Sequence, residues 1–133
     1  MCSTSRIWEE WPQPPTWIEV KKHTPISASV SWDVIVKGTK GRSSRYKRGV
    51  LRQQLEMECF RQGIANPRYL ECTKRGNEDT AVFWSHCRDE IGASDGEGAE
   101  YIVVKFQLHG TITQLHGYPV TLRELRNEYG VNI

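Results

Sequence analysis

The sequence contains no long apolar run: none of its 133 residues lies in a stretch approaching the roughly 20 apolar residues of a membrane-crossing helix. The opening segment MCSTSRIWEEWPQPP also lacks the apolar core of a secretory signal, so we expect no export. Close cysteine pairs are missing too, because the four cysteines are 57, 13 and 15 residues apart. We therefore expect reduced thiols, no metal site and no cofactor.

Motifs that mark common catalytic sites are absent as well. The sequence has no G-x-S-x-G, no H-E-x-x-H and no glycine-rich phosphate loop. His109 and His116 stand at opposite ends of one predicted strand, which leaves open a small ribonuclease or toxin-like domain that uses them as an acid–base pair. Surface histidines near turns are the simpler interpretation. We expect a protein that is not an enzyme.

Two segments are strongly biased toward charge of one sign. Residues 37–48 carry six basic side chains and no acid, whereas residues 78–100 carry seven acids and one base, and the whole chain sums to +2. The basic run suits contacts with nucleic-acid phosphates, which would make binding fall steeply with salt. A solvated loop, or a docking site for an acidic protein partner, is the alternative that this run leaves open.

Five Trp, five Tyr and three Phe in a chain of low net charge indicate one folded domain over residues 1–133. Its first part, residues 1–16, is predicted to hold a tryptophan-bearing helix and a proline-rich loop. Periodicity predicts helices over 5–11, 45–62, 79–91 and 119–129, strands over 17–21, 27–37 and 69–74, and a hairpin over 101–113. This order predicts an α+β fold, with an antiparallel sheet that carries its helices on one face.

Two predicted strands have distinct faces. In 27–37 the apolar positions alternate, which predicts one buried face for residues Ala28, Val30, Trp32, Val34 and Val36. The hairpin turns at His109-Gly110, with Ile102, Val104, Phe106 and Ile112 on one face and Lys105, Gln107, Thr111 and Thr113 on the other. Hydroxyls, an amide and a cation suit contacts with the phosphates and 2′-hydroxyls of double-stranded RNA, although ordinary solvated sheets carry similar residues.

Trp8 and Trp11 lie three residues apart on the predicted N-terminal helix, so both indoles project from one side. They are candidates for stacking on exposed base pairs. The alternative is a helix held to the body of the protein by two buried indoles.

Several segments, in order, resemble the tombusvirus nineteen-kilodalton RNA-silencing suppressor family and its aureusvirus fourteen-kilodalton relative. Trp8-Glu9-Glu10-Trp11 is similar to the family's W-T-E-W helix, and Ser31-Trp32 followed by Arg45-Tyr46 is similar to its S-W strand and K-R-Y helix start. Residues 79–88 (DTAVFWSHCR) and 106–125 (FQLHGTITQLHGYPVTLREL) resemble a further helix and the hairpin region of the family.

The resemblance implies a viral suppressor in the cytoplasm of the host cell that binds short interfering RNA duplexes regardless of their sequence. It implies a homodimer whose joined sheets form one concave RNA-binding surface, with Trp8 and Trp11 stacked on the duplex ends. It also implies that Arg45, Tyr46 and Arg48 meet phosphates and that Thr111 lies on the RNA face, with Thr113 nearby. Our assignment of faces adds Lys37, Lys40, Lys105 and Gln107 to the residues expected to contact the RNA backbone.

Overall fold

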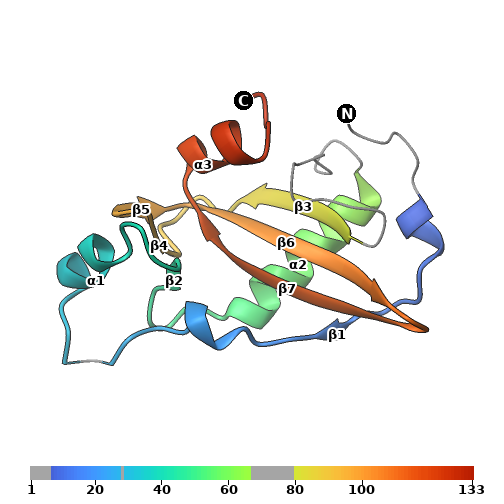
Figure 1. Cartoon of the computed structure of the whole chain (residues 1–133), viewed down its shortest axis with the longest axis horizontal. Coiled ribbons are helices and arrows are strands. Elements are labelled where there is room, and N and C mark those ends of the chain that lie inside the picture. The colour runs from blue at the N-terminus through green and yellow to red at the C-terminus, as the bar shows by residue number, and fades with distance from the viewer. Residues whose placement is uncertain (1–6, 28, 67–79) are drawn as a thin grey trace.

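The computed structural model describes residues 7–27, 29–66 and 80–133, which form an α+β fold (Figure 1). The α-helices are α1 (Trp32–Gly38), α2 (Arg52–Ala65) and α3 (Leu122–Glu128), and two short 3-10 helices are η1 (Ile7–Glu10) and η2 (Lys21–His23). The strands are β1 (Thr16–Trp17), β2 (Arg45–Tyr46), β3 (Thr80–His86), β4 (Gly92–Ser94), β5 (Glu97–Ala99), β6 (Tyr101–His109) and β7 (Ile112–Val120).

The strands form two sheets. The larger has the order β1-β7-β6-β3 and is antiparallel except for the parallel pair of β1 with β7, and the smaller has the order β2-β4-β5. The β6–β7 hairpin pairs Tyr101 with Val120 at one end and His109 with Ile112 at the other, and Gly110 in the turn has a φ of 62°. The predicted hairpin is confirmed, but its turn lies one residue later than expected, at Gly110 and Thr111, and its second strand extends to Val120.

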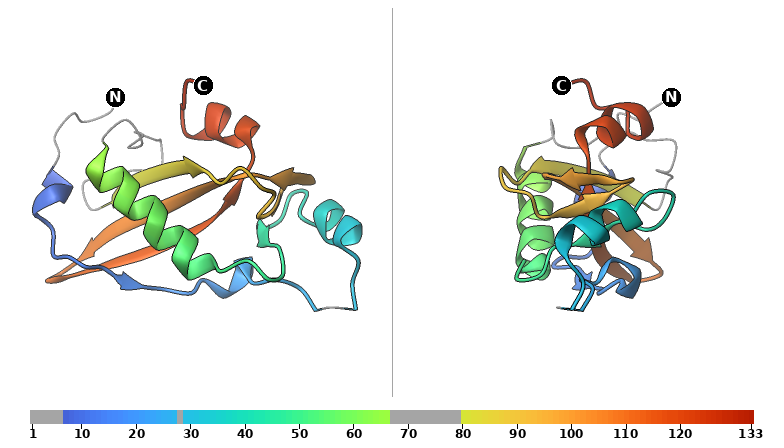
Figure 2. Two further views of the ribbon diagram at one scale, coloured as in Figure 1. Left: turned by 180° about the vertical axis from the view of Figure 1, so that it is seen from behind. Right: turned by 90° about the vertical axis from the view of Figure 1, so that its left-hand side faces the viewer.

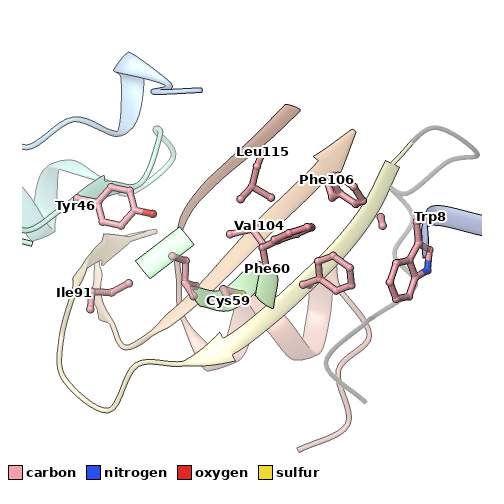
Figure 3. Close-up of a cluster of buried hydrophobic side chains, with 11 residues drawn as sticks. Trp8, Tyr46, Cys59, Phe60, Ile91, Val104, Phe106 and Leu115 are labelled. Atoms are coloured by element: carbon pink, nitrogen blue, oxygen red, sulfur yellow. The ribbon is translucent and has the colours of Figure 1, made fainter. Parts of the chain in front are cut away.

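Helix α2 lies along one face of the larger sheet, as the two views of Figure 2 show. Phe60 of the helix contacts Phe83 and Phe106 of the sheet edge to face, with ring centroids 6.1 and 4.8 Å apart. The helix comes close to the sheet at Gly63, where an added Cβ would lie 2.3 Å from the Phe83 ring. Figure 3 shows the resulting core, in which Trp8, Cys59 and Leu115 also take part.

Helix α3 packs on the opposite face, so the prediction that all helices lie on one face was wrong. Leu125 and Tyr129 join Val82, Trp84 and Val103 in a second buried cluster. Because neighbouring residues of a strand point to opposite faces, Val103 belongs to this cluster while Ile102 and Val104 belong to the core under α2. The helix starts at Leu122 rather than at the predicted position 119, since Thr121 and Glu124 form a capping box.

The predicted strand over 27–37 is instead helix α1. Ser31 caps it by accepting a hydrogen bond from the backbone N–H of Val34 at 3.4 Å, and Asp33 stands in the first turn. Val34, expected to be buried, is 60% exposed, whereas Ile35 is 6% exposed. The short alternation of apolar residues was therefore outweighed by a local cap.

The predicted helix over 79–91 is also wrong, because residues 80–86 form strand β3. Residues 81–85 are all buried, since α2 covers one face of this strand and α3 covers part of the other. A strand covered on both faces has no alternating pattern to distinguish it from a helix. The strand predicted over 69–74 lies outside the described residues.

The other predicted elements are shorter than expected. The helix predicted over 45–62 begins only at Arg52, after β2 and after Gly49, which has a φ of 85°. Cys59 and Phe60 of this helix face the core, whereas Leu51, directly before it, is 64% exposed. Of the strand predicted over 17–21, only Trp17 pairs with β7 as a strand residue.

A buried polar network ties the N-terminal half of the chain to α2. The carboxylate of Glu56, a fully buried side chain, accepts hydrogen bonds from Tyr46 Oη at 2.7 Å and Trp17 Nε1 at 3.0 Å, and Arg52 Nε lies 3.5 Å from it. Arg52 also donates to the carbonyl of Val20 at 3.2 Å. Burial raises the pKa of Glu56, while these donors act in the opposite direction.

Candidate nucleic-acid interface

The face of the larger sheet that α2 leaves uncovered carries a group of polar side chains. Cross-strand register places Gln107 opposite Gln114, and Lys105 opposite His116, on adjacent strands of this open face. Lys22 of η2 lies close enough to His116 to affect its titration. We call Lys22, Lys105, Gln107, Gln114 and His116 the polar stretch. In Figure 1, α2 lies behind β6 and β7, so the view is onto the open face of the hairpin.

The polar stretch is electropositive. The open-face positions of β3, β6 and β7, all within the described residues, include no Asp or Glu. Burial lowers the pKa of His116, and the positive charges of Lys105 and Lys22 lower it further. The charged side chains Lys105 and Lys22, which act on the pKa of His116, are thus both cations.

Buried and stacked aromatic rings lie next to the polar stretch. His23 is 6% exposed, stacks on Tyr118 with ring centroids 5.1 Å apart, and its Nδ1 lies 2.8 Å from the carbonyl oxygen of Ser44. Burial lowers its pKa to about 4, so the neutral ring donates to Ser44 at neutral pH. Lys105 Nζ lies 5.7 Å from the centroid of the same Tyr118 ring. The lysine head is thus positioned by aromatic groups that are themselves fixed.

The hairpin residues predicted to contact RNA divide between the two faces. Lys105 and Gln107 lie on the open face, and Gln107 also donates to Thr80 Oγ1 at 3.4 Å. Thr111 is exposed in the turn. Thr113 is 2% exposed and donates to the carbonyl of Pro12 at 2.6 Å, on the face covered by α2. The placement of Thr113 beside Lys105 was wrong because a two-residue turn exchanges odd and even positions between the faces.

The two tryptophans predicted to stack on RNA ends pack against the core. Trp8 is 4% exposed and meets Phe83 edge to face, with ring centroids 5.2 Å apart (Figure 3). Trp11 is partly buried, and its ring centroid lies 5.3 Å from that of Phe106. In this arrangement Trp8 has almost no free surface for a base pair. The partial exposure of Trp11 leaves its stacking role as a prediction.

The basic run has both exposed and structural members. Lys37, Lys40 and Arg48 are exposed. Arg45 donates to the carbonyl of Thr24 at 2.9 Å, and Tyr46 is buried in the Glu56 network. Arg45 and Tyr46 therefore hold the fold together at the position where the sequence predicted phosphate contacts.

The acidic run lies against the basic run rather than on a separate face. The backbone N–H of Gly41 donates to Asp95 Oδ1 at 3.4 Å, and the N–H of Gly96 donates to Thr39 Oγ1 at 3.0 Å. Lys47 Nζ lies 3.5 Å from a carboxylate oxygen of Glu90. Figure 1 shows α1 beside β5 at one end of the molecule, away from the hairpin turn. Neighbouring acids thus reduce the attraction of this end for phosphates.

His109 and His116 share the open face but do not face each other. His116 pairs with Lys105, four residues from His109 along β6, which corresponds to roughly 13 Å along the strands. Two rings that flank one scissile bond would need to stand closer together. The ribonuclease alternative gains no support from this geometry.

The described residues contain no reactive thiol and no group of side chains that could bind a metal ion. Cys59 is buried, and burial raises its pKa to about 12; burial likewise raises the pKa of Cys87 to about 11. No group of three or more His, Cys, Asp or Glu residues that could hold a metal ion occurs within residues 7–27, 29–66 and 80–133. Both thiols therefore remain protonated at neutral pH.

Comparison of the chain with protein-family models, with curated proteins and with solved structures gave no match. In the part of the chain that the structure describes, no helix has the length and apolar character needed to span a membrane.

Sequence reasoning missed three members of the polar stretch: Lys22, Gln114 and His116. Gln114 and His116 belong to a strand that continues beyond position 113, and the alternation of residues 114–120 was the available signal. Lys22 follows β1, which pairs with β7, and this contact between distant parts of the chain is one that no local pattern predicts.

Proposed function

We propose that this protein binds double-stranded RNA without reading its sequence, and that it suppresses RNA silencing by sequestering short interfering duplexes. The observation that carries the proposal is the polar stretch on the open face, with Lys105 and Lys22 as cations and no carboxylate on the strands beneath. Salt-dependent attraction to phosphates follows from the cations. The suppressor role and its viral setting come from the family resemblance in the sequence.

The side chains favour a duplex over a single strand. Unpaired bases are bound mainly by stacking on exposed aromatic rings. On the open face, Tyr118 is engaged with His23 and Tyr129, and Trp84 is 9% exposed in the cluster under α3. The amide and ammonium groups of the polar stretch suit the phosphates and 2′-hydroxyls along the groove of an RNA duplex.

A second copy of the chain would extend the surface, as the resemblance implies. A nine-residue strand such as β6 spans roughly 30 Å, and α3 covers part of that length. The polar stretch of one protomer is therefore short compared with a duplex of about two helical turns. We propose a homodimer whose two polar stretches contact one duplex, which light scattering of the protein with and without RNA would measure.

The deciding experiment compares duplex and single-stranded RNA of equal length by fluorescence anisotropy over a salt series. The Lys105→Gln variant should weaken duplex binding and reduce the slope of log K against log salt by about one. Arg61→Gln is the matched control, because Arg61 is an exposed cation on α2, on the opposite side of the sheet. Equal affinity for both RNA forms would exclude the duplex proposal.

The same experiment also tests whether the basic run of residues 37–48, rather than the open face, binds the RNA. If Lys37→Gln and Lys40→Gln weaken binding more than Lys105→Gln does, then the α1 end is the interface and the open face is not. Absence of RNA binding at low salt would favour a protein-interaction module. Cleavage of labelled RNA that is lost in His109→Ala would favour a ribonuclease.

End stacking has its own test, and Trp11 is the informative residue because Trp8 is needed in the core. Trp11→Ala should flatten any preference among duplexes of different length while the far-UV circular dichroism stays unchanged. A length preference that survives this substitution contradicts an end-stacking role for Trp11.

A further inference from the structure

Ser43 lies in the middle of the basic run, in the irregular segment between α1 and β2, and its side chain is partly exposed. Within residues 7–27, 29–66 and 80–133, its hydroxyl has no hydrogen-bond partner. The neighbouring Ser44 differs, because it is 6% exposed and its Oγ lies 3.1 Å from His23 Nδ1. Of the two adjacent hydroxyls, that of Ser43 can therefore react with another macromolecule without breaking a buried contact.

Basic side chains precede and follow Ser43 in the sequence. Lys40 and Arg42 stand three residues and one residue before it and are both exposed, and Arg45 stands two residues after it. Charge patterns of this kind are a main feature by which protein kinases select their substrates. A kinase whose substrate groove carries carboxylates would bind the cations before Ser43 and place its hydroxyl at the reaction centre.

The acidic run contacts the same loop, but its charge there is paired. Asp95 accepts the N–H of Gly41 through Oδ1 at 3.4 Å, and Arg123 Nη2 lies 3.1 Å from its Oδ2. The carboxylate of Asp95 therefore has a cationic partner outside the basic run. It does not reverse the positive charge of the residues before Ser43.

The backbone before Ser43 can enter the groove of an enzyme without opening a sheet. It is held by turn hydrogen bonds, such as the one from the N–H of Arg42 to the carbonyl of Thr39 at 3.0 Å. Sheet pairing begins only at Arg45, which stands opposite Ala93 of β4. Exposed turns open locally at a small cost compared with paired strands.

We propose that Ser43 is phosphorylated by a protein kinase that selects basic residues, and that this modification weakens RNA binding. The Ser43 Oγ forms a bond to the γ-phosphorus of a nucleoside triphosphate and releases its proton. The bond from that phosphorus to the β–γ bridging oxygen breaks, and the nucleoside diphosphate leaves with the electron pair. The product carries about −1.5 to −2 additional charges at pH 7. The effect on RNA rests on the proposed function, whereas the modification site does not.

The position of Ser43 explains why its phosphate would repel RNA. The carbonyl oxygen of the adjacent Ser44 lies 2.8 Å from Nδ1 of His23 in η2, so the loop and η2 are in contact. Two exposed lysines of η2, Lys21 and Lys22, directly precede His23. The Debye length is about 8 Å at physiological salt, so the added charge acts on RNA phosphates bound near these lysines.

The first experiment determines where phosphate is incorporated. The full chain is incubated with ATP and cyclic-AMP-dependent protein kinase, a probe that selects serines preceded by basic residues, and the product is mapped by mass spectrometry. We expect phosphate on Ser43, at a rate about tenfold lower in Arg42→Gln, which lacks one charged contact with the kinase. Ser27→Ala is the matched control, because Ser27 is an exposed serine without Lys or Arg in the three residues before it, and should leave the rate unchanged. No incorporation, incorporation on another residue, or an unchanged rate in Arg42→Gln would overturn the site.

The second experiment compares the duplex affinity of the phosphorylated and unmodified chains by anisotropy. The phosphorylated chain should bind roughly three- to tenfold more weakly at about 0.1 M salt, and the difference should shrink as salt is added. Ser43→Glu should show a smaller loss, and Gln53→Glu should show almost none, because Gln53 is exposed on α2, which covers the opposite face of the sheet.

The possible failures are distinct. Equal affinity of the phosphorylated and unmodified chains would overturn the effect on RNA binding while the mapped site stands. Failure of the unmodified chain to bind any duplex would refute the proposed function, and with it the effect on RNA, independently of where the phosphate is found.

Discussion

The substitution Glu56→Ala should destabilise this protein strongly, because Glu56 is the common acceptor of the buried polar network. Its side chain has no exposed surface, and Tyr46, Trp17 and Arg52 all donate toward it. Alanine leaves the Arg52 guanidinium without its buried counter-charge. It also leaves the Tyr46 hydroxyl and the Trp17 N–H without an acceptor at this position.

The expected magnitude follows from the loss of one partner of a buried ion pair, which costs about 3–5 kcal/mol. The entropy of unfolding is about 2.1 cal/mol/K per residue, which gives roughly 0.28 kcal/mol/K for the 133 residues. Glu56→Ala should therefore lower the melting temperature by roughly 11–18 °C. Glu56→Gln should cost less, since its amide keeps the volume and one acceptor oxygen.

Thermal and urea unfolding monitored by tryptophan fluorescence measure this loss. The matched control is Glu58→Ala on the same helix, because Glu58 pairs with Arg61 at 2.8 Å while both side chains are more than half exposed. Exposed pairs contribute about 0–1 kcal/mol, so the control should shift the melting temperature by less than about 4 °C.

A double-mutant cycle of Glu56→Ala with Arg52→Ala completes the test. Each single variant leaves the other residue without its buried partner. The loss in free energy of unfolding of the double variant should therefore be smaller than the sum of the two single losses by about 1–3 kcal/mol. Additive costs, or a Glu56→Ala shift no larger than that of Glu58→Ala, would refute the role of this network.

Three further outcomes are expected. The pKa of His23 is lowered to about 4 in the folded protein, so the unfolded chain binds the proton first; the free energy of unfolding should fall by up to roughly 3 kcal/mol from pH 6.5 to 4, and less in His23→Asn. Trp8→Ala should cost about 3–5 kcal/mol in urea unfolding, because the indole is buried against the core; a cost below 1 kcal/mol would contradict this packing. Gly117→Ala should cost about 1–3 kcal/mol in the same assay, since its Cβ would lie 2.6 Å from the Val103 carbonyl oxygen; a neutral effect would show that the strands can shift.

The local sequence pattern predicted correctly those parts of the fold in which the neighbouring signals agree. The hairpin of residues 101–120 combines regular alternation with a glycine turn, and both signals agree. Strand β3 was not predicted because helices cover both of its faces. Apolar residues therefore occupy both faces, and its sequence does not alternate between apolar and polar residues. Helix α1 was not predicted because the alternation of apolar residues concealed the helix cap at Ser31.

In the candidate site, too, residues placed by the pattern of a single strand were predicted, and residues placed by contacts distant in the sequence were not. Lys105 and Gln107 were assigned to the open face from alternation within one strand. Thr113 was misplaced, and His116 was missed as an RNA contact, because the parity of the second strand depends on the length of the turn. Lys22 depends on pairing between residues almost the whole chain apart, which only the folded structure shows.

The pairing of β1 with β7 also has a consequence for how the protein is made. Thr16 and Trp17 pair with Gln114 and Leu115, and the hydrogen bond from Thr113 to Pro12 spans 101 residues. During translation the N-terminal segment therefore has no partner strand until residue 115 has left the ribosome. Non-local pairing of this kind forms slowly and leaves apolar groups exposed in the meantime. The indoles near the N-terminus are thus exposed on the nascent chain, and the larger sheet is completed only late in synthesis.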